Sequence, residues 1–360
     1  MTPNRPVLVT GASGFVGSHV TRLLVEEGRK VRVLLRKTSS TAAIRDLPVE
    51  IVHGDALDPH SLRSAMQGCG TVFFCVVDPR YYLTDPAPLF RNNVEGLING
   101  MDAALASGVE RFIFTSTMGT LGQNSTGPVT EEIEFNWMEK APPYIRSRRQ
   151  AEDQFNKYCR EKGLPGVALC ISTTYGPQDF QPTPQGKMLW DTSQGRTKVV
   201  WEAAQPVVDI RDAAHALLLA EKHGRIGERY IISHESVSYR EFYAQVAALG
   251  GHAAPIVLPL PVAYAAAWFG ETLLKLWRRQ DYFVSRDAVY LSIAFRELDS
   301  SKARRELHWK SRPTAETIRD AIAWFSERNK VAPIGAGSPS YFGRSSRVFV
   351  ERRTIDDQRK

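Results

Sequence analysis

The sequence predicts an α/β protein, with a doubly wound parallel β-sheet and a smaller, mostly helical C-terminal substrate domain. Over residues 7–174, short apolar runs typical of β-strands alternate with amphipathic helical segments, which indicates right-handed βαβ units. Runs such as residues 71–77 are almost wholly apolar, as expected for parallel strands covered by helices on both faces. The third observation is a glycine-rich turn between the first strand and the first helix.

The predicted elements follow one another in a regular order. Strands are expected at residues 7–10, 31–35, 50–53, 71–77, 111–116 and 167–174, and helices at residues 15–27, 59–67, 88–107 and 144–162. Later segments predict strands at residues 206–210 and 229–233, a helix at residues 211–222, and mainly helical structure over residues 239–328.

The chain divides where its composition changes, at the turn-rich segment that begins after residue 178. We expect a main, sheet-bearing domain from residues 5–178 and 206–234. The interleaved segments 179–205 and 235–330 would form the substrate domain, and residues 331–360 would be a basic, flexible tail.

The composition excludes several classes of protein. The chain has 43% hydrophobic and 24% charged residues, an ordinary globular composition. Its formal charge of +7 is mild, and no long basic run or basic–aromatic alternation is present, so no nucleic-acid partner is expected. The four cysteines form no C-x-x-C pair and lie beside no histidine cluster, which predicts no metal site. With no signal peptide before the first strand, they indicate a reducing cytoplasm.

The longest apolar stretch, residues 256–277, is not a clean membrane span, because two prolines and two charged residues interrupt it. We expect a substrate-domain helix that packs on a pocket. The alternative is a peripheral membrane contact through the apolar side chains of Trp268, Phe269, Leu273, Leu274 and Trp277.

The glycine-rich turn carries Gly11, Gly14 and Gly17 in a G-x-x-G-x-x-G spacing. Residues without a Cβ allow a tight turn and a close approach of the backbone to a pyrophosphate. The helix that follows would direct its free N–H groups and its positive dipole end at that anion. The alternative is an ordinary glycine-rich strand–helix turn. The expected cofactor-binding residues here are Gly11, Ser13, Gly14, Phe15, Val16 and Gly17.

Arg36 and Lys37 follow the second strand, and the next acidic residue is Asp46. NAD-preferring sites usually place a carboxylate here on the ribose 2′-OH, whereas cations attract the 2′-phosphate of NADP. The sequence therefore favours NADP(H), with NAD(H) possible; the alternative is that both cations are only solvated. After the third strand, Asp55 and the adjacent Ala56 are expected at the adenine, although Asp55 could equally cap the next helix.

Two further segments carry candidate chemistry: the hydroxyl-rich residues 114–122, which end the fifth strand, and the helix that begins near Tyr144. A hydroxyl at a strand end can polarise a carbonyl oxygen while a tyrosine moves the proton. Arg148 lies at i+4 from Tyr144, on the same helix face. Its charge would stabilise tyrosinate and lower the pKa of Tyr144, normally about 10.

The chain resembles the extended short-chain dehydrogenases/reductases of the NAD(P)-dependent epimerase/dehydratase group. Within that group it is most similar to the dihydroflavonol-reductase, 3β-hydroxysteroid-dehydrogenase and hopanoid-associated epimerase-like branch. The resemblance covers about residues 6–328 and rests on residues 10–17, 54–58, 93–96, 115–117, 144 with 151–152, 175–177 and 227–230.

This resemblance implies a Rossmann-type fold, hydride transfer at nicotinamide, and a homodimer formed through the helices after strands four and five. By position, Thr117 would be the active-site Ser/Thr and Tyr144 the acid/base. Arg148 would hold the nicotinamide ribose, and Asn93 would be the supporting asparagine.

The chain departs from the family pattern in three places. Arg148 replaces the lysine of Tyr-x-x-x-Lys, and because arginine does not lose its proton, a lysine-type proton relay is lost. Val76 and Val77 stand where two alanines are usual beside the cofactor. Residues 170–172 replace an Asn-Pro-Ser near the nicotinamide, where Ser172 remains a candidate contact.

The substrate cleft is expected to be aromatic and weakly charged, which suits a flat or bulky apolar alcohol or ketone such as a sterol, terpenoid or flavonoid. The bordering candidates are Tyr81, Tyr82, Trp137, Met138, Phe180, Met188, Trp190 and Trp201, with Arg80, Lys187 and Arg196 as the charged ones. For each aromatic residue the alternative is core packing.

We therefore predict an NADP(H)-dependent oxidoreductase acting on an apolar secondary alcohol or ketone. One alternative is a nucleotide-sugar epimerase or dehydratase with tightly bound NAD(P). The other, suggested by Arg148, is a non-catalytic or weakly active cofactor-binding protein.

Overall fold

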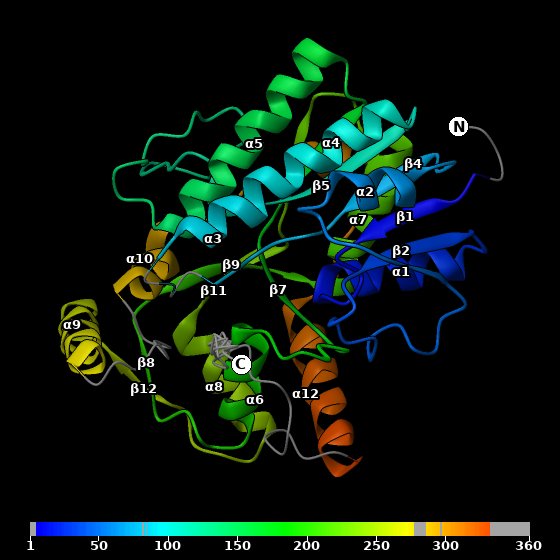
Figure 1. Ribbon diagram of the computed structural model, residues 1–360. Helices are drawn as coiled ribbons and strands as arrows, with labels where there is room; N and C mark the ends of the chain where they lie inside the picture. Colours follow the sequence, from blue (N-terminus) through cyan, green and yellow to red (C-terminus); the bar gives the residue numbers. More distant parts are fainter. Residues whose placement is uncertain (1–4, 81–82, 84, 277–285, 296, 332–360) are drawn as a thin grey trace, which may run out of the picture.

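The computed structural model describes residues 5–80, 83, 85–276, 286–295 and 297–331 (Figure 1). Its strands are β1 (Val7–Thr10), β2 (Val31–Leu35), β3 (Glu50–His53), β4 (Thr71–Phe74), β5 (Arg111–Thr117), β6 (Gly166–Ile171), β7 (Thr173–Tyr175), β8 (Val199–Trp201), β9 (Ala204–Asp209), β10 (Arg229–Ile232), β11 (Glu235–Ser238) and β12 (Ile256–Leu258).

Its helices are α1 (Phe15–Glu26), α2 (Pro59–Met66), α3 (Ala87–Phe90), α4 (Gly96–Ala106), α5 (Pro143–Lys162), α6 (Pro184–Ser193), α7 (Ile210–His223), α8 (Tyr239–Leu249), α9 (Leu260–Leu276), α10 (Arg286–Ala294), α11 (Ser301–Glu306) and α12 (Thr314–Val331). A π-helical turn, Arg91–Glu95, joins α3 to α4, and a 3-10 turn, Met118–Thr120, follows β5.

The main sheet is parallel throughout and has the order β10-β6-β5-β4-β1-β2-β3. This confirms the predicted doubly wound sheet. The chain order reverses between β1 and β4, where Val9 lies opposite Phe73. In such sheets the ligand crevice lies outside the carboxyl ends of the strands at this reversal.

Helices cover both faces of the sheet because its strands alternate their side chains between two apolar cores (Figure 1). Val9, Val33 and Phe73 pack in one core with side chains from α1, α7 and α11. Leu8, Leu34 and Phe74 pack in the other with side chains from α2, α4 and α5. Because the helices cover the two faces, the carboxyl edge of the sheet is the place where a ligand site is expected.

A second unit lies beside that edge. It contains a three-stranded sheet, β11-β9-β7, and the pair β12-β8, with α6, α8 and α12 around an apolar core. The predicted single strand 167–174 is divided at Ser172, whose N–H donates to Ile232 O at 3.0 Å. Beyond that bond the chain leaves the main sheet, and β7 pairs with β9 instead.

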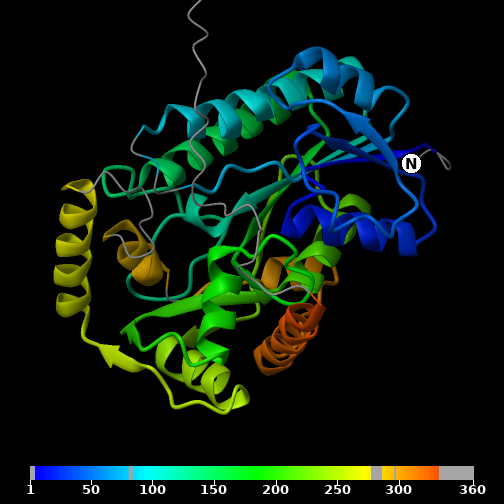
Figure 2. The same cartoon turned by 60° about the horizontal axis from the view of Figure 1, so that its bottom comes forward.

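The predicted division into two domains remains a prediction, and two elements depart from it. β9, expected with the main domain, belongs to the small sheet, whereas α11 and Trp309, expected with the substrate domain, pack in the core under α7. Figure 2 shows α9 at the periphery of the molecule. In the described part of the chain, no helix is long and apolar enough to cross a membrane. The tail from residue 332, Tyr81, Tyr82 and Trp277 lie outside the described residues.

Candidate active site

The glycine turn between β1 and α1 leaves no room for side chains. Gly11 has φ +73°, and a Cβ on it would lie 2.6 Å from Cys75 O. A Cβ on Gly17 would lie 2.3 Å from Gly11 O. The N-cap position of α1 is Gly14, which has no side chain to bind the first N–H groups of the helix. These N–H groups therefore remain available to a ligand. This cradle fits a pyrophosphate.

The predicted adenosine end lies at the carboxyl ends of β2 and β3. Arg36 and Lys37 are exposed, and neither forms an ion pair with another described residue. The Asp55 carboxylate accepts the N–H of Leu57 at 2.9 Å, next to the nearly buried Ala56. The alternative that Asp55 caps α2 is wrong, because Asp58 does so through the N–H of His60 at 3.0 Å.

The structure brings Thr117 and Tyr144 together. Thr117 ends β5, where its hydroxyl accepts the N–H of Gly119 at 3.3 Å, and Tyr144 stands in the first turn of α5. Burial raises the pKa of Tyr144, while the charge of Arg148 and a hydrogen bond with Thr117 act to lower it. Arg148 therefore acts in the predicted direction, but the expected net lowering is wrong because burial is the larger effect.

Arg148 lies inside the protein rather than at its surface. It is 2% exposed, its Nη2 donates to Thr115 O at 2.5 Å, and its guanidinium carbon lies 5.1 Å from the centre of the Phe114 ring. Burial lowers its pKa. Its Nε and the Oγ of Ser172 are buried without a partner among the described residues. Buried polar atoms usually have partners, so these two atoms fit hydroxyl or amide groups of a bound cofactor.

Asn93 joins the end of β4 to the start of α5. Its side-chain oxygen accepts the N–H of Asp78 at 2.8 Å, and its amide donates to Asp78 O at 3.1 Å and to Ser147 Oγ at 3.0 Å. The Ser147 hydroxyl donates in turn to Tyr144 O at 2.7 Å. The supporting role expected of Asn93 therefore fits its contacts, whereas sequence reasoning missed Asp78 and Ser147.

A buried ionic cluster centred on Glu152 binds Ser116 and Thr120, the neighbours of Thr117 in the chain. The Glu152 carboxylate accepts the hydroxyls of Ser116 and Thr120, the second at 2.7 Å. Arg229 on β10 donates to the same carboxylate at 2.9 Å. A buried carboxylate without partners would be costly, so these contacts are expected to persist. They therefore hold the end of β5 in place.

The substrate-side candidates fall into two groups. Trp137 and Trp190 are 4% exposed and pack in apolar cores, which is the alternative considered for them. Met188 and Trp201 are partly buried against the small-domain core. The others are Met138, which is exposed, and Phe180, which packs on Trp324 and Arg328.

The charged candidates form ion pairs with acidic neighbours. Lys187 and Arg196 both pair with Asp191, and Arg80 pairs with Asp78. The expected weakly charged cleft is consistent with these ion pairs.

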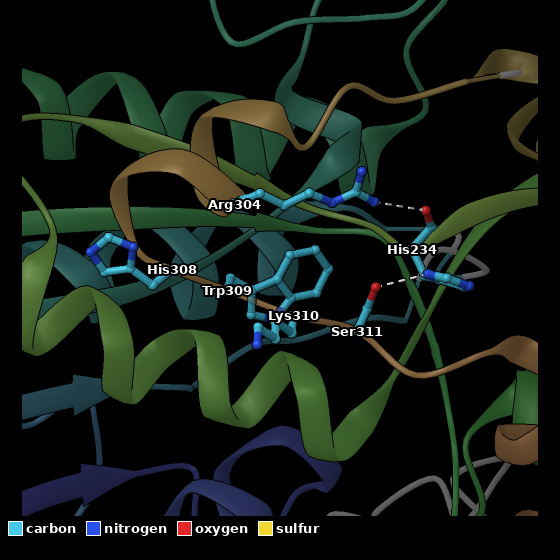
Figure 3. A pocket seen from close by; sticks show the side chains of 6 residues that line it. All are labelled: His234, Arg304, His308, Trp309, Lys310 and Ser311. Atoms are coloured by element: carbon cyan, nitrogen blue, oxygen red, sulfur yellow. Dashed lines mark hydrogen bonds between the residues drawn. The ribbon is translucent and has the colours of Figure 1, made fainter.

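Two surface pockets are formed by the described residues, and Met138 and Arg229 are among those that line the second. One, of about 580 Å³, is lined by His234, Arg304, His308, Trp309, Lys310 and Ser311; His234 bonds Ser311 at 2.8 Å (Figure 3). The other, of about 840 Å³, has lining residues of both charges near the edge strand β10. Neither is lined by the glycine turn, Thr117 or Tyr144. Within the described residues, no cluster of His, Cys, Asp and Glu could hold a metal ion.

A parallel sheet with a glycine turn at its reversal, and a hydroxyl, a tyrosine and a cation at the same edge, defines an NAD(P)-dependent oxidoreductase. The chain belongs to the NAD-dependent epimerase/dehydratase family, within the extended short-chain dehydrogenases/reductases, because that family's model matches residues 7–233.

Known proteins similar to this chain include reductases. It is 30% identical to a putative dihydroflavonol 4-reductase from Synechocystis, over 90% of this chain and 95% of that protein. It is 31% identical to sterol demethylase protein B from Methylococcus capsulatus, over 90% and 99%. The crystal structure of gox2253 has a TM-score of 0.81 and 34% identity, covering 91% of this chain and 99% of the other.

Proposed function

We propose that the protein is an NADP(H)-dependent oxidoreductase that interconverts a secondary alcohol and a ketone on a bulky apolar substrate. The contact between Thr117 and Tyr144, next to Arg148, is the observation that carries the proposal. The similarity to a dihydroflavonol reductase and a sterol demethylase protein supports a polycyclic substrate.

The residues divide the chemistry among them. When bound, the nicotinamide supplies or accepts the hydride. The Thr117 hydroxyl polarises the substrate oxygen, and Tyr144 gives that oxygen its proton during ketone reduction. Arg148 holds the ribose and stabilises negative charge on Tyr144, and Asn93 holds the first turn of α5 in place through Ser147.

Stoichiometric oxidation of NADPH with sterol-like, terpenoid or flavonoid ketones tests this function. The family model equally supports a nucleotide-sugar epimerase or dehydratase with tightly held cofactor. Cofactor that co-purifies with the protein, together with turnover of a nucleotide sugar without net change in NADPH, would establish that alternative instead.

The preference for NADP(H) rests on Arg36 and Lys37. We expect Arg36→Gln with Lys37→Gln to weaken NADPH binding by about tenfold or more, since one charge-assisted hydrogen bond contributes roughly 1.5–3 kcal/mol. NADH binding should be unchanged. Lys30→Gln is the matched control, because Lys30 is also exposed but precedes β2 at its opposite end. Fluorescence titration with both nucleotides measures the effect, and equal losses for NADPH and NADH would contradict the assignment.

Two partners are also proposed. One is a second copy of this chain, joined through α4 and α5. The other is a membrane surface, contacted by α9, where Trp268 and Phe269 are 49% and 67% exposed. The sequence continues with Arg278 and Arg279, so an anionic lipid surface complements this segment.

The membrane contact predicts that the protein sediments with anionic vesicles and that removing the exposed rings of α9 weakens this binding. Trp268→Ser with Phe269→Ser should reduce the vesicle-bound fraction several-fold, because these two large, exposed rings would lose their apolar contact with the membrane. Ile226→Ser is the control, since Ile226 is 58% exposed outside α9. Equal vesicle binding by the double variant and the control would refute the contact.

A further inference from the structure

A polar side chain from the segment between β7 and α6 reaches the glycine turn. The amide nitrogen of Gln181 donates a hydrogen bond to the carbonyl oxygen of Ser13 at 3.4 Å. In Figure 1 this segment leaves β7, runs toward α1 and turns back to α6. The contact therefore joins the second unit to the turn that fits a pyrophosphate, and no role assigned so far explains it.

The carbonyl that Gln181 binds belongs to the peptide that joins Ser13 to Gly14. The N–H of this same peptide donates to Gly11 O at 2.9 Å. Because a peptide is planar, hydrogen bonds on both of its sides fix its orientation. The N–H of Ser18 donates to Gly14 O at 3.0 Å, and the N–H groups between these two residues have no carbonyl partner within the helix. The direction of these N–H groups depends on the peptide that precedes them.

The start of α6 holds the segment that carries Gln181. Asp179 is 1% exposed, and its carboxylate accepts the N–H and the hydroxyl of Thr183, both at 2.8 Å. The Thr183 hydroxyl in turn accepts the N–H of Gly186 at 3.0 Å and so caps α6. A Cβ on Gly186 would lie 2.2 Å from the Asp179 carboxylate, so the helix packs directly against this side chain.

Helix α12 holds the same segment through a second set of contacts. Arg328 Nη1 donates to Asp179 O at 3.1 Å, and its guanidinium carbon lies 5.4 Å from the centre of the Phe180 ring. Phe180 also packs edge-on against Trp324, with ring centres 5.2 Å apart. Gln178 has a left-handed backbone, with φ +64°, which persists in a residue other than glycine where its surroundings fix it. The segment is therefore a firm support for the side chain that reaches the glycine turn.

We propose that Gln181 is a positioning residue through which the second unit holds the glycine turn ready for the pyrophosphate and slows release of the dinucleotide. A hydrogen bond that is made before the ligand arrives lowers the cost of ordering the site. The inference rests on the proposed function in one respect, because it requires a dinucleotide at the glycine turn. It requires no particular substrate and no preference for NADP(H), since NADPH and NADH carry the same pyrophosphate.

The test removes the amide donor from the full chain and measures binding of NADPH and NADH by stopped-flow fluorescence. Gln181→Met keeps the length of the side chain but cannot donate. It should weaken both dinucleotides by roughly threefold to tenfold, the usual effect of one neutral hydrogen bond. The loss should appear mainly as faster dissociation, the rate in which related sites differ most. Gln185→Met is the matched control, because Gln185 is exposed in the first turn of α6, and it should leave both affinities unchanged.

Adenosine 2′-phosphate separates positioning of the turn from a general loss of structure. This ligand has no 5′-phosphate and reaches only the adenosine end of the site, so Gln181→Met should bind it as the unaltered protein does. Gln181→Glu provides a second variant, in which a carboxylate of the same shape lies beside the expected anion. It should weaken the dinucleotides more than Gln181→Met does, and added salt should reduce the difference.

Two results would overturn the role of Gln181. One is release of NADPH from Gln181→Met no faster than from Gln185→Met. The other is an equal loss of affinity for adenosine 2′-phosphate and for NADPH, which would indicate a disturbed fold. No ketone enters these measurements, so the expected changes in a protein that reduces no ketone would count against the proposed function alone.

Discussion

Tyr144→Phe is expected to lower kcat for ketone reduction by roughly 10²–10⁴-fold, the usual contribution of a positioned acid or base. The hydroxyl of Tyr144 contacts Thr117 and lies in the first turn of α5, so the substrate oxygen would lose its proton donor. The phenyl ring keeps its packing, so the affinity for NADPH should stay within about twofold, since little binding energy is lost. Steady-state kinetics and NADPH titration separate the two quantities.

Tyr158→Phe is the matched control for this experiment. Tyr158 lies on the same helix, and its hydroxyl donates to Asp102 at 3.0 Å, away from Thr117. It should reduce ketones at nearly the original rate. Unchanged NADPH oxidation by Tyr144→Phe would show that another group supplies the proton, and Thr117 would then lose its assigned role as well.

Much of the scaffold could be predicted from local sequence patterns. The apolar runs, the helical periodicity and the glycine spacing all act over a few residues, and the parallel sheet that they predict is present. The relation of Tyr144 to Arg148 was equally accessible, because an i+4 spacing on a helix fixes two side chains on one face. Family membership followed from the same short motifs.

The parts that the sequence did not predict depend on contacts between distant segments. Nothing in the residues around Asp78 indicates that Asn93 will bind its main chain, fifteen positions away. The net pKa of Tyr144 was misjudged because its burial arises from tertiary packing, whereas the charge of Arg148 is local. Trp137 and Trp190 illustrate the same limit, since an aromatic residue in a polar segment can fill either a cleft or a core.

Arg148 belongs between these two cases. The sequence alone shows that Arg148 replaces the lysine of the family pattern, and this replacement predicts a weakly active protein as one alternative. The structure places the guanidinium inside the fold, where it binds Thr115 O and keeps Nε without a partner among the described residues. Positive charge beside Tyr144 is therefore retained even though the proton relay of a lysine is not.

Gly11→Ala is expected to lower the affinity for NADPH by at least a hundredfold, an order-of-magnitude expectation for a displaced phosphate-binding turn, and Gly28→Ala is the matched control. Both glycines have left-handed backbones, with φ of +73° and +72°, so each alanine costs about 1–2 kcal/mol of backbone strain. A Cβ on Gly28 meets nothing within 4 Å, whereas a Cβ on Gly11 would lie 2.6 Å from Cys75 O. The difference between the variants therefore isolates the contact that closes the turn against the segment after β4.

The folding stability of Gly28→Ala should fall by about 1–2 kcal/mol, the cost of that strain, while its affinity for NADPH stays the same. Gly11→Ala must either push the segment after β4 away or open the turn, and both changes displace the backbone that would approach the pyrophosphate. We expect at least a hundredfold loss of NADPH affinity, measured by calorimetry at a temperature where circular dichroism shows both variants folded. If Gly11→Ala binds NADPH as tightly as Gly28→Ala, the pyrophosphate does not lie at this turn, and the site must be sought elsewhere along the carboxyl edge.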